Sequence, residues 1–332
     1  MVPFWGENCY NRLMVYESVG EKGERIRRRV RAANYLVVAQ LFLRDNFLLK
    51  RKLEFADVKP RLLGHWGSCY GINLAYAVAR EYFAAKGKEW AFILGPGHGF
   101  PALNANLFID GEVVDREGEK VTELAEFCRE FSWPEGFPSH ASPLTPGVVT
   151  EGGELGYALG AAYGQVLGHP EKNVVVVVGD GEMETATALA SLNLAKIIPS
   201  GEKNGRVWPI LHLNGYKISG PTILGRKSER ELLELVRGFG YTPIETRGEA
   251  EEFYTVMREA EKVKNPFIIL ASEKGETGPE FVEGKKVKGN YLAHQIPLAK
   301  AGSDEGQLEM LEKWLESYEF AELYSEKEGF TI

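Results

Sequence analysis

Apolar runs alternate with helical segments along this chain and predict an α/β fold. Residues 173–178 are an asparagine followed by five valines, and residues 209–213 form a second apolar run. Consecutive β-branched residues without polar alternation are typical of a strand buried on both faces, as in a parallel sheet. The alanine-rich segment 183–198 between the two runs has the composition of a helix. We therefore predict a βαβ unit over residues 173–216.

The same alternation continues on both sides of this unit. Helices are predicted over 24–43, 72–86, 121–130, 154–167, 229–238, 249–263 and 303–318. Further strands are predicted over 90–94, 241–245 and 267–270, and loops over 60–67, 95–99, 132–150 and 273–299. The stretch between 100 and 120 is poorly patterned. Alternation of this kind predicts an open, mostly parallel sheet with helices on both faces.

Composition places the chain among globular proteins. Of its 332 residues, 44% are hydrophobic and 26% are charged, which are ordinary values for a packed domain. We divide it into an N-terminal arm (1–23), a main domain (24–302) and a C-terminal amphipathic helix with its tail (303–332). The net charge of −8 argues against nucleic acid or an anionic membrane as the main partner.

The three cysteines and the hydropathy pattern bear on the compartment. Cys9, Cys69 and Cys128 are widely separated and fit neither a disulfide framework nor a zinc site. We expect Cys69 to be a buried structural thiol. No segment resembles a signal peptide, and no apolar run is long enough to cross a membrane. These observations favour the cytoplasm.

Polar residues follow the two central strands where each strand ends. Gly179, Asp180 and Gly181 follow the first strand, and Asn214 and Tyr216 follow the second. Ligands bind beyond the carboxyl ends of parallel strands, and glycines followed by a helix N-terminus let a bulky anion approach the backbone. A carboxylate, an amide oxygen and a backbone carbonyl leave room for Mg²⁺ to bind a diphosphate. The alternative is an ordinary strand-to-helix turn in which Asp180 caps the helix.

Four of the six histidines lie in loops rich in glycine and proline: His65, His98, His140 and His294. As a group they indicate a site that exchanges protons near neutral pH, because histidine can both donate and accept. Their spacing does not fit a zinc motif borne on one helix. His169 reads as part of a surface turn, and His212 as a histidine inside a buried strand.

Several peptides carry a resemblance to a known family. The Gly-Asp-Gly-Glu at 179–182, with Asn214 at the next strand end, resembles the thiamine diphosphate motif of the transketolase superfamily. Other peptides resemble phosphoketolase: Gly-His-Trp-Gly (64–67), Gly-Pro-Gly-His-Gly (95–99), Ser-His-Ala-Ser-Pro (139–143), Thr-Pro-Gly (145–147), Glu-Gly-Gly-Glu-Leu-Gly (151–156) and Leu-His-Leu-Asn-Gly-Tyr-Lys (211–217). The resemblance extends from about Arg31 to the end of the chain.

This resemblance implies thiamine diphosphate and Mg²⁺ as cofactors and assigns residues to them. The metal ligands would be Asp180, Asn214 and Tyr216. The cofactor-binding residues would be Gly152, Gly153, Gly179, Asp180, Gly181, Glu182 and Asn214. The catalytic histidines would be His65, His98, His140 and His294, which line the substrate channel in the family. The implied reaction cleaves a ketose phosphate with inorganic phosphate to acetyl phosphate and an aldose phosphate.

The resemblance also implies a partner. In the family, a pyrimidine-binding domain with the glutamate that activates the cofactor follows the part seen here. We therefore expect a diphosphate-binding subunit of a split phosphoketolase, assembled as two copies each of this chain and a pyrimidine-domain subunit. Departures on the presumed substrate side, at 68–70, Phe100 and 148–150, leave two alternatives open. One is a split transketolase-like enzyme that transfers a two-carbon unit to an aldehyde, and the other is a non-catalytic thiamine diphosphate-binding scaffold.

Overall fold

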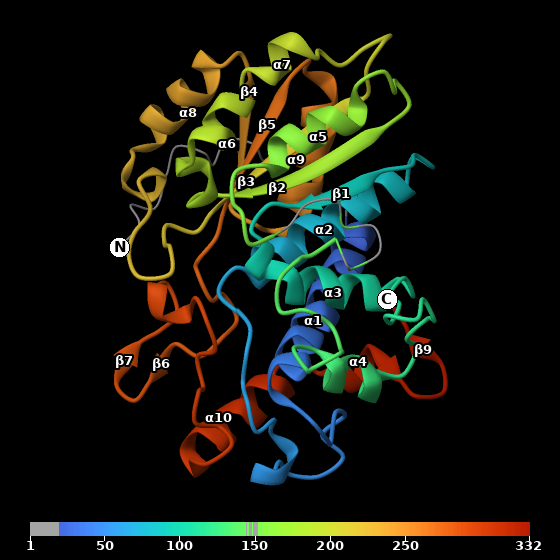
Figure 1. Ribbon diagram of the computed structural model, residues 1–332, viewed down its shortest axis with the longest axis vertical. Helices are drawn as coiled ribbons and strands as arrows, with labels where there is room; N and C mark the ends of the chain where they lie inside the picture. Colours follow the sequence, from blue (N-terminus) through green and yellow to red (C-terminus); the bar gives the residue numbers. More distant parts are fainter. Residues whose placement is uncertain (1–19, 144, 146–147, 149–151) are drawn as a thin grey trace. The chain divides into compact units, whose positions relative to one another are not determined.

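The computed structural model describes residues 20–143, 145, 148 and 152–332, which divide into two compact units (Figure 1). The sheet unit comprises residues 20–26, Leu74–Gly97 and Glu154–Glu273. The helical unit comprises the described residues of Arg27–Asn73, His98–Gly153 and Lys274–Ile332. Neither unit is one continuous segment, so the domain boundaries expected from the sequence stay a prediction. Residues 1–19 of the expected arm lie outside the described residues.

The sheet unit is built on a five-stranded sheet in which every neighbouring pair is parallel, as predicted. Its strand order is β1-β2-β3-β5-β4. The strands are β1 (Ala91–Leu94), β2 (Asn173–Gly179), β3 (Arg206–Leu213), β4 (Thr242–Thr246) and β5 (Pro266–Ala271). The valines of β2 are all buried, because β2 has neighbours on both edges and helices on both faces. Burying a valine contributes about 1.5–3 kcal/mol, which explains why this segment forms a central strand.

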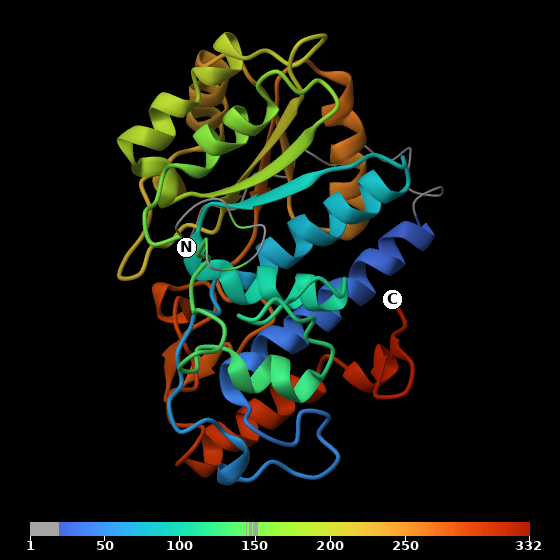
Figure 2. The same cartoon turned by 45° about the vertical axis from the view of Figure 1, so that its right-hand side comes forward.

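Helices cover both faces of this sheet. On one face, α5 (Ala158–Val166), α6 (Ala186–Ser191), α7 (Leu194–Ile197) and α8 (Glu229–Gly238) share a core with Val174, Val176 and Val178. On the other face, the Trp208 ring of β3 meets Tyr82 and Phe83 at the end of α2 (Cys69–Ala84). Tyr254 of α9 (Ala250–Lys262) lies edge-on against Tyr82. Figures 1 and 2 both show α5 and α9 on opposite sides of the strands.

The helical unit packs its helices through aromatic side chains. Its helices are most of α1 (Gly20–Phe42), the start of α2, α3 (Phe100–Ile109), α4 (Leu124–Glu130) and α10 (Glu305–Glu316). Two short hairpins complete it: β6 (Phe281–Val282) with β7 (Lys285–Lys286), and β8 (Tyr324–Ser325) with β9 (Gly329–Phe330). The rings of Trp66 and Trp314 lie 4.8 Å apart at their centroids, and those of Phe108 and Phe127 lie 4.3 Å apart.

A buried polar network joins three helices of this unit. Asn73 donates to Asn34, and Asn106 donates to Asn73, at 2.7 and 2.8 Å. Arg29 donates to both the side chain and the carbonyl of Asn106 and pairs with Asp110 at 2.7 Å. Because buried amides are costly unless they are bonded, this network fixes how α1, α2 and α3 pack together.

One helix was not predicted and one predicted helix is broken, both for physical reasons. The poorly patterned stretch after residue 99 contains α3, in which eight of ten residues are buried, so no polar stripe reveals its period. The helix predicted over 183–198 is broken into a 3₁₀ turn (Glu182–Glu184), α6 and α7. Thr185 caps α6 by accepting the N–H of Ala188, so the first α-helical residue after the glycines is Ala186.

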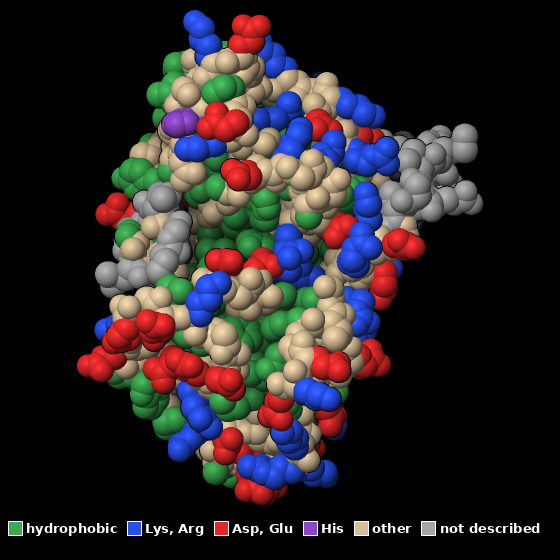
Figure 3. Space-filling view, turned by 90° about the vertical axis from the view of Figure 1, so that its right-hand side faces the viewer, with side chains coloured by type: hydrophobic (Ala, Val, Ile, Leu, Met, Phe, Trp, Pro, Cys, Tyr) green, Lys and Arg blue, Asp and Glu red, His purple; other side chains and the backbone are tan. Residues whose placement is uncertain are grey.

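The surface agrees with the composition. Acidic and basic side chains are interspersed on the face shown in Figure 3, with apolar side chains between them. Among the described residues, no helix combines the length and apolarity needed to cross a membrane.

Candidate functional site

Asp180 lies where β2 and β3 end side by side. The register pairs Gly179 with His212, so the residues after both strands meet at one edge of the sheet. The Asp180 N–H donates to the His212 carbonyl at 3.2 Å, and its carboxylate is almost fully buried. Oδ2 accepts the N–H of Gly215 at 2.6 Å, and Oδ1 accepts the N–H of Gly181 at 2.9 Å. The Asp180 carboxylate thus meets the end of the next strand, while its predicted role as a metal ligand stays a prediction.

The same edge brings together the oxygen types that suit Mg²⁺. Asn214 is buried, and its Oδ1 accepts the N–H of Tyr216 at 3.2 Å. Gly215, between these two residues, donates to Asp180. A carboxylate, an amide oxygen and backbone carbonyls are ligands that Mg²⁺ prefers, so the donor set fits that ion. Among the described residues, no three His, Cys, Asp or Glu side chains gather to hold a metal, so the fit depends on this mixed set.

The Glu182 carboxylate accepts hydrogen bonds from backbone N–H groups near this edge. Its Oε1 accepts the N–H of Gly156 at 3.1 Å, and its Oε2 accepts the N–H of Gly179 at 3.2 Å. Burial raises the pKa of Glu182 to about 7, while these N–H bonds oppose that rise. The carboxylate therefore holds two loops of the sheet unit together, and a direct bond from it to a cofactor stays a prediction.

The predicted cofactor-binding glycines divide between the two units. Gly179 and Gly181 flank Asp180 in the sheet unit. Gly152 and Gly153 belong to the helical unit, where the Gly152 N–H donates to the Ala141 carbonyl at 2.8 Å. Their contact with a cofactor stays a prediction.

The four predicted catalytic histidines form one cluster in the helical unit. The His65 ring is central: its centroid lies 5.3 Å from that of His98 and 5.0 Å from those of His140 and His294. His98 and His294 are 4.6 Å apart. Residues separated by more than 200 positions in the sequence thus come into contact. The prediction that they form a group is confirmed, while their catalytic role stays a prediction.

Backbone packing explains how two of these histidines meet. Gly67 lies against residues 293–294 so closely that a Cβ on it would be 2.6 Å from the Ala293 carbonyl oxygen. The N–H of Gly275 donates to the Gly67 carbonyl at 2.8 Å. Only glycine permits this approach, which places His65 and His294 on adjacent stretches of backbone.

Hydrogen bonds to serine hydroxyls orient two rings of the cluster, and each of the two other rings has a nitrogen without a hydrogen-bond partner among the described residues. Ser68 Oγ lies 3.2 Å from His98 Nε2, and Ser139 Oγ lies 3.1 Å from His140 Nδ1. Within the described part of the chain, the buried Nδ1 atoms of His65 and His294 have no hydrogen-bond partner. Buried polar atoms are normally bonded, so these two nitrogens are suited to a ligand.

The profile of the family described as XFP N-terminal domain matches residues 19–261 and 250–331, nearly the whole chain. The chain belongs to the XFP N-terminal domain family.

Relatives of this XFP N-terminal domain are described as probable phosphoketolases. One from Bradyrhizobium diazoefficiens is 42% identical over 320 residues, covering 89% of this chain and 40% of the relative. One from Nitrosospira multiformis is 41% identical over 329 residues, covering 89% of this chain and 41% of the relative. The chain therefore spans about 40% of the length of the curated relatives it matches.

Solved transketolase structures share its fold. The transketolase from Campylobacter jejuni has a TM-score of 0.60 at 16% identity, covering 90% of this chain and 47% of that one. The transketolase from Leishmania mexicana has a TM-score of 0.59 at 16% identity, covering 90% and 45%. The predicted open, mostly parallel α/β fold of this XFP N-terminal domain is thereby confirmed as one that transketolases share.

Two buried residues of this XFP N-terminal domain contact or act on the predicted site residues but were not predicted from the sequence. Thr222 is fully buried, and its Oγ1 donates to Asp180 Oδ2 at 3.0 Å. Lys274 is also buried, and its charge acts on the histidine cluster. Neither has a sequence signal, because a threonine after Gly-Pro reads as a turn residue and a lysine in a Gly- and Lys-rich loop reads as exposed.

Three imidazoles of the cluster, those of His65, His98 and His294, are held neutral. Burial, followed by the charges of His140 and Lys274, lowers the pKa of His65 to about 4. Burial, followed by the charge of Lys274 and by His65, lowers the pKa of His294 to about 3. Burial and His294 also hold the pKa of His98 well below its usual range. A neutral imidazole can accept a proton and donate one, as acid–base chemistry requires.

These pKa shifts predict a pH-dependent stability. An unfolded histidine titrates near pH 6.5, whereas His65 and His294 stay neutral in the folded protein down to about pH 4. Unfolding should therefore take up protons below about pH 6.5, roughly one for each shifted histidine near pH 4–5, and stability should fall as pH falls through this window. Above pH 7 these residues should contribute no pH dependence.

Denaturant unfolding measured at half-unit steps from pH 4 to 8 would test this expectation. The variant His65→Asn should reduce the proton uptake by about one. An unchanged uptake in His65→Asn would show that its pKa in the folded protein is ordinary.

The remaining histidines and cysteines behave as the sequence indicated. His212 is buried in β3, with Nε2 2.8 Å from Ser272 Oγ. His169 is exposed and lies 3.2 Å from Glu171. Cys69 and Cys128 are free and buried, and burial raises the pKa of both thiols. Cys9 lies outside the described residues.

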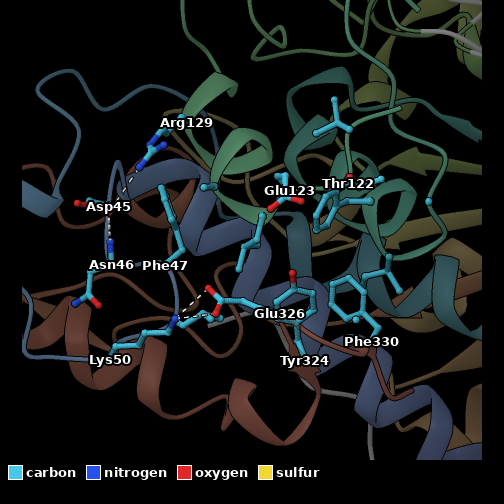
Figure 4. A pocket seen from close by; sticks show the side chains of 18 of the residues that line it. Asp45, Asn46, Phe47, Lys50, Thr122, Glu123, Arg129, Tyr324, Glu326 and Phe330 are labelled. Carbon is cyan, nitrogen blue, oxygen red and sulfur yellow. Dashed lines mark hydrogen bonds and ion pairs between the residues drawn. The ribbon is translucent and has the colours of Figure 1, made fainter. Parts of the chain in front are cut away.

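Two cavities of the helical unit differ in their relation to the cluster. One of about 600 Å³ is lined by His65 together with Lys59, Gln295 and Ile296, so it reaches the cluster. Another of about 700 Å³, shown in Figure 4, contains none of the predicted site residues. Two ion pairs lie around it, Asp45 with Arg129 and Lys50 with Glu326.

Proposed function

We propose that this chain is the diphosphate-binding part of a thiamine diphosphate-dependent phosphoketolase. The observation that carries the proposal is the buried Asp180 carboxylate, held beside Asn214 at the carboxyl ends of β2 and β3. Membership of the XFP N-terminal domain family supports the reaction class. The reaction would convert a ketose phosphate and inorganic phosphate into acetyl phosphate, an aldose phosphate and water.

The sheet unit would hold the cofactor. Asp180, Asn214 and the Tyr216 carbonyl would bind Mg²⁺, which would bridge to the two phosphate groups. Gly179 and Gly181 would let the diphosphate approach the backbone. When bound, thiamine diphosphate supplies an electron sink for breaking a carbon–carbon bond.

The histidine cluster would handle the substrate. The buried Nδ1 atoms of His65 and His294 would bond to sugar hydroxyls. A neutral imidazole would take a proton from one hydroxyl and return it to the hydroxyl that leaves as water. Because their pKa values are about 4 and 3, the protonated forms of His65 and His294 would be stronger acids than an ordinary imidazolium, which suits that second step.

A separate polypeptide would complete the enzyme. The chain covers only about 40% of its curated relatives, and the uncovered part would supply the pyrimidine-binding domain with its activating glutamate. We propose two copies of each polypeptide and a cytoplasmic location, in keeping with the free, buried Cys69 and Cys128.

The test is to recover the tagged chain from its native cell extract and assay the complex for acetyl phosphate. The assay would contain xylulose 5-phosphate or fructose 6-phosphate, inorganic phosphate, Mg²⁺ and thiamine diphosphate. Acetyl phosphate that requires inorganic phosphate and a stoichiometric partner is the expected result. Two-carbon transfer to an aldehyde without phosphate would identify a transketolase-like enzyme, and cofactor binding without turnover would identify a scaffold.

A further inference from the structure

The hydroxyl of Thr222 connects the Asp180 carboxylate to the turn that follows β3. Its Oγ1 donates to Asp180 Oδ2 at 3.0 Å and accepts the N–H of Gly225 at 3.0 Å. Thr222 is fully buried, and its N–H donates to the Gly215 carbonyl at 2.9 Å. One residue thus joins Asp180, the end of β3 and the following turn, with its hydroxyl and its backbone N–H.

The directions of these hydrogen bonds fix what the carboxylate can do. Because Gly225 donates to Thr222 Oγ1, the single hydroxyl proton is available to Asp180. Oδ2 then accepts two hydrogen bonds, one from Thr222 and one from Gly215. Two bonds occupy the two lone pairs of that oxygen, so the metal ion would be met by Oδ1, which also accepts the N–H of Gly181.

Thr222 is held in this position by close backbone packing. A Cβ on Gly225 would lie 2.6 Å from the Gly215 Cα and 2.8 Å from Thr222 Oγ1, so the turn closes tightly on itself. Tyr216 and Pro221 form a β-bridge within the same turn. The hydroxyl therefore reaches Asp180 from a turn that is closed by tight backbone contacts.

We propose that Thr222 is a positioning residue that orients Asp180 for its divalent cation. The proposal rests on the proposed cofactor site. The role assigned to Thr222 is indirect, because its proton goes to Asp180 and one of its lone pairs accepts the N–H of Gly225. Substitution of a residue that orients a metal ligand typically lowers metal affinity by about 10- to 100-fold.

Mn²⁺ binding to the purified chain, followed by the electron paramagnetic resonance signal of free Mn²⁺, tests this proposal without any turnover. Titrations would be made with Mn²⁺ alone and with Mn²⁺ plus thiamine diphosphate. Thr222→Val keeps the shape but removes the hydroxyl, and we expect about 10- to 100-fold weaker Mn²⁺ binding. Thr222→Ser keeps the hydroxyl and should bind within about threefold of the wild-type chain, because the bond to Asp180 survives.

The matched control is Thr255→Val on α9: the Thr255 hydroxyl donates to the Glu251 carbonyl of the same helix, and this variant should bind Mn²⁺ normally. Thermal unfolding would confirm that each variant is folded, and Thr222→Ala replaces Thr222→Val if the latter is not. If the folded Thr222→Val or Thr222→Ala variant bound Mn²⁺ as tightly as the wild-type chain, the positioning role of Thr222 would be overturned. The metal site itself would still stand. Absence of Mn²⁺ binding by the wild-type chain would overturn the metal site and this proposal together.

Discussion

Replacing Asp180 with asparagine is expected to abolish phosphate-dependent acetyl phosphate formation, with a loss of more than about 100-fold. Asparagine removes the negative charge that a divalent cation needs. It also puts an amide NH₂ against a backbone N–H in either orientation of the side chain, since Gly215 donates to one carboxylate oxygen and Gly181 donates to the other. The one oxygen that asparagine keeps would then not be held in the direction of the metal.

The measurement is the initial rate of acetyl phosphate release by the reconstituted complex, together with thiamine diphosphate binding by calorimetry. Glu202→Gln is the matched control, because it removes a carboxylate from an exposed position of the same unit. Wild-type rates and cofactor affinity in Asp180→Asn would rule out the proposed metal site.

His294→Asn is expected to lower kcat by about 10²- to 10⁴-fold while leaving the melting temperature nearly unchanged. The side chain is buried in the histidine cluster, and its Nδ1 has no hydrogen-bond partner in the described residues. Its removal therefore breaks no bond through that atom, whereas a structural histidine would lose stability. Cofactor binding should be retained, because the proposed metal ligands belong to the sheet unit.

Steady-state kinetics and thermal unfolding of the same preparation would check this expectation. His169→Asn is the control, since that histidine is exposed and belongs to a surface turn. A large fall in melting temperature with proportionate loss of activity would instead indicate that His294 serves the fold.

The sheet could be predicted from the sequence because its signals are local. Five valines in succession specify a strand buried on both faces, and the helix at Glu229–Gly238 was predicted with the observed bounds. That helix has a strong polar and apolar period and a capping box between Ser228 and Glu231, so its ends are written in neighbouring residues. By contrast, α3 is buried on nearly every side and has no such period.

By itself the sequence determined the parallel α/β sheet, the family and the residue types at the strand ends. The tertiary structure decided which atoms meet. It turned both oxygens of Glu182 toward backbone N–H groups and placed Thr222 on Asp180. It also buried Lys274 beside the histidines, although its loop composition indicated exposure. Hydrophobic periodicity and turn chemistry act over a few residues, whereas burial and hydrogen-bond direction depend on segments that are distant in the chain, so only the folded chain fixes them.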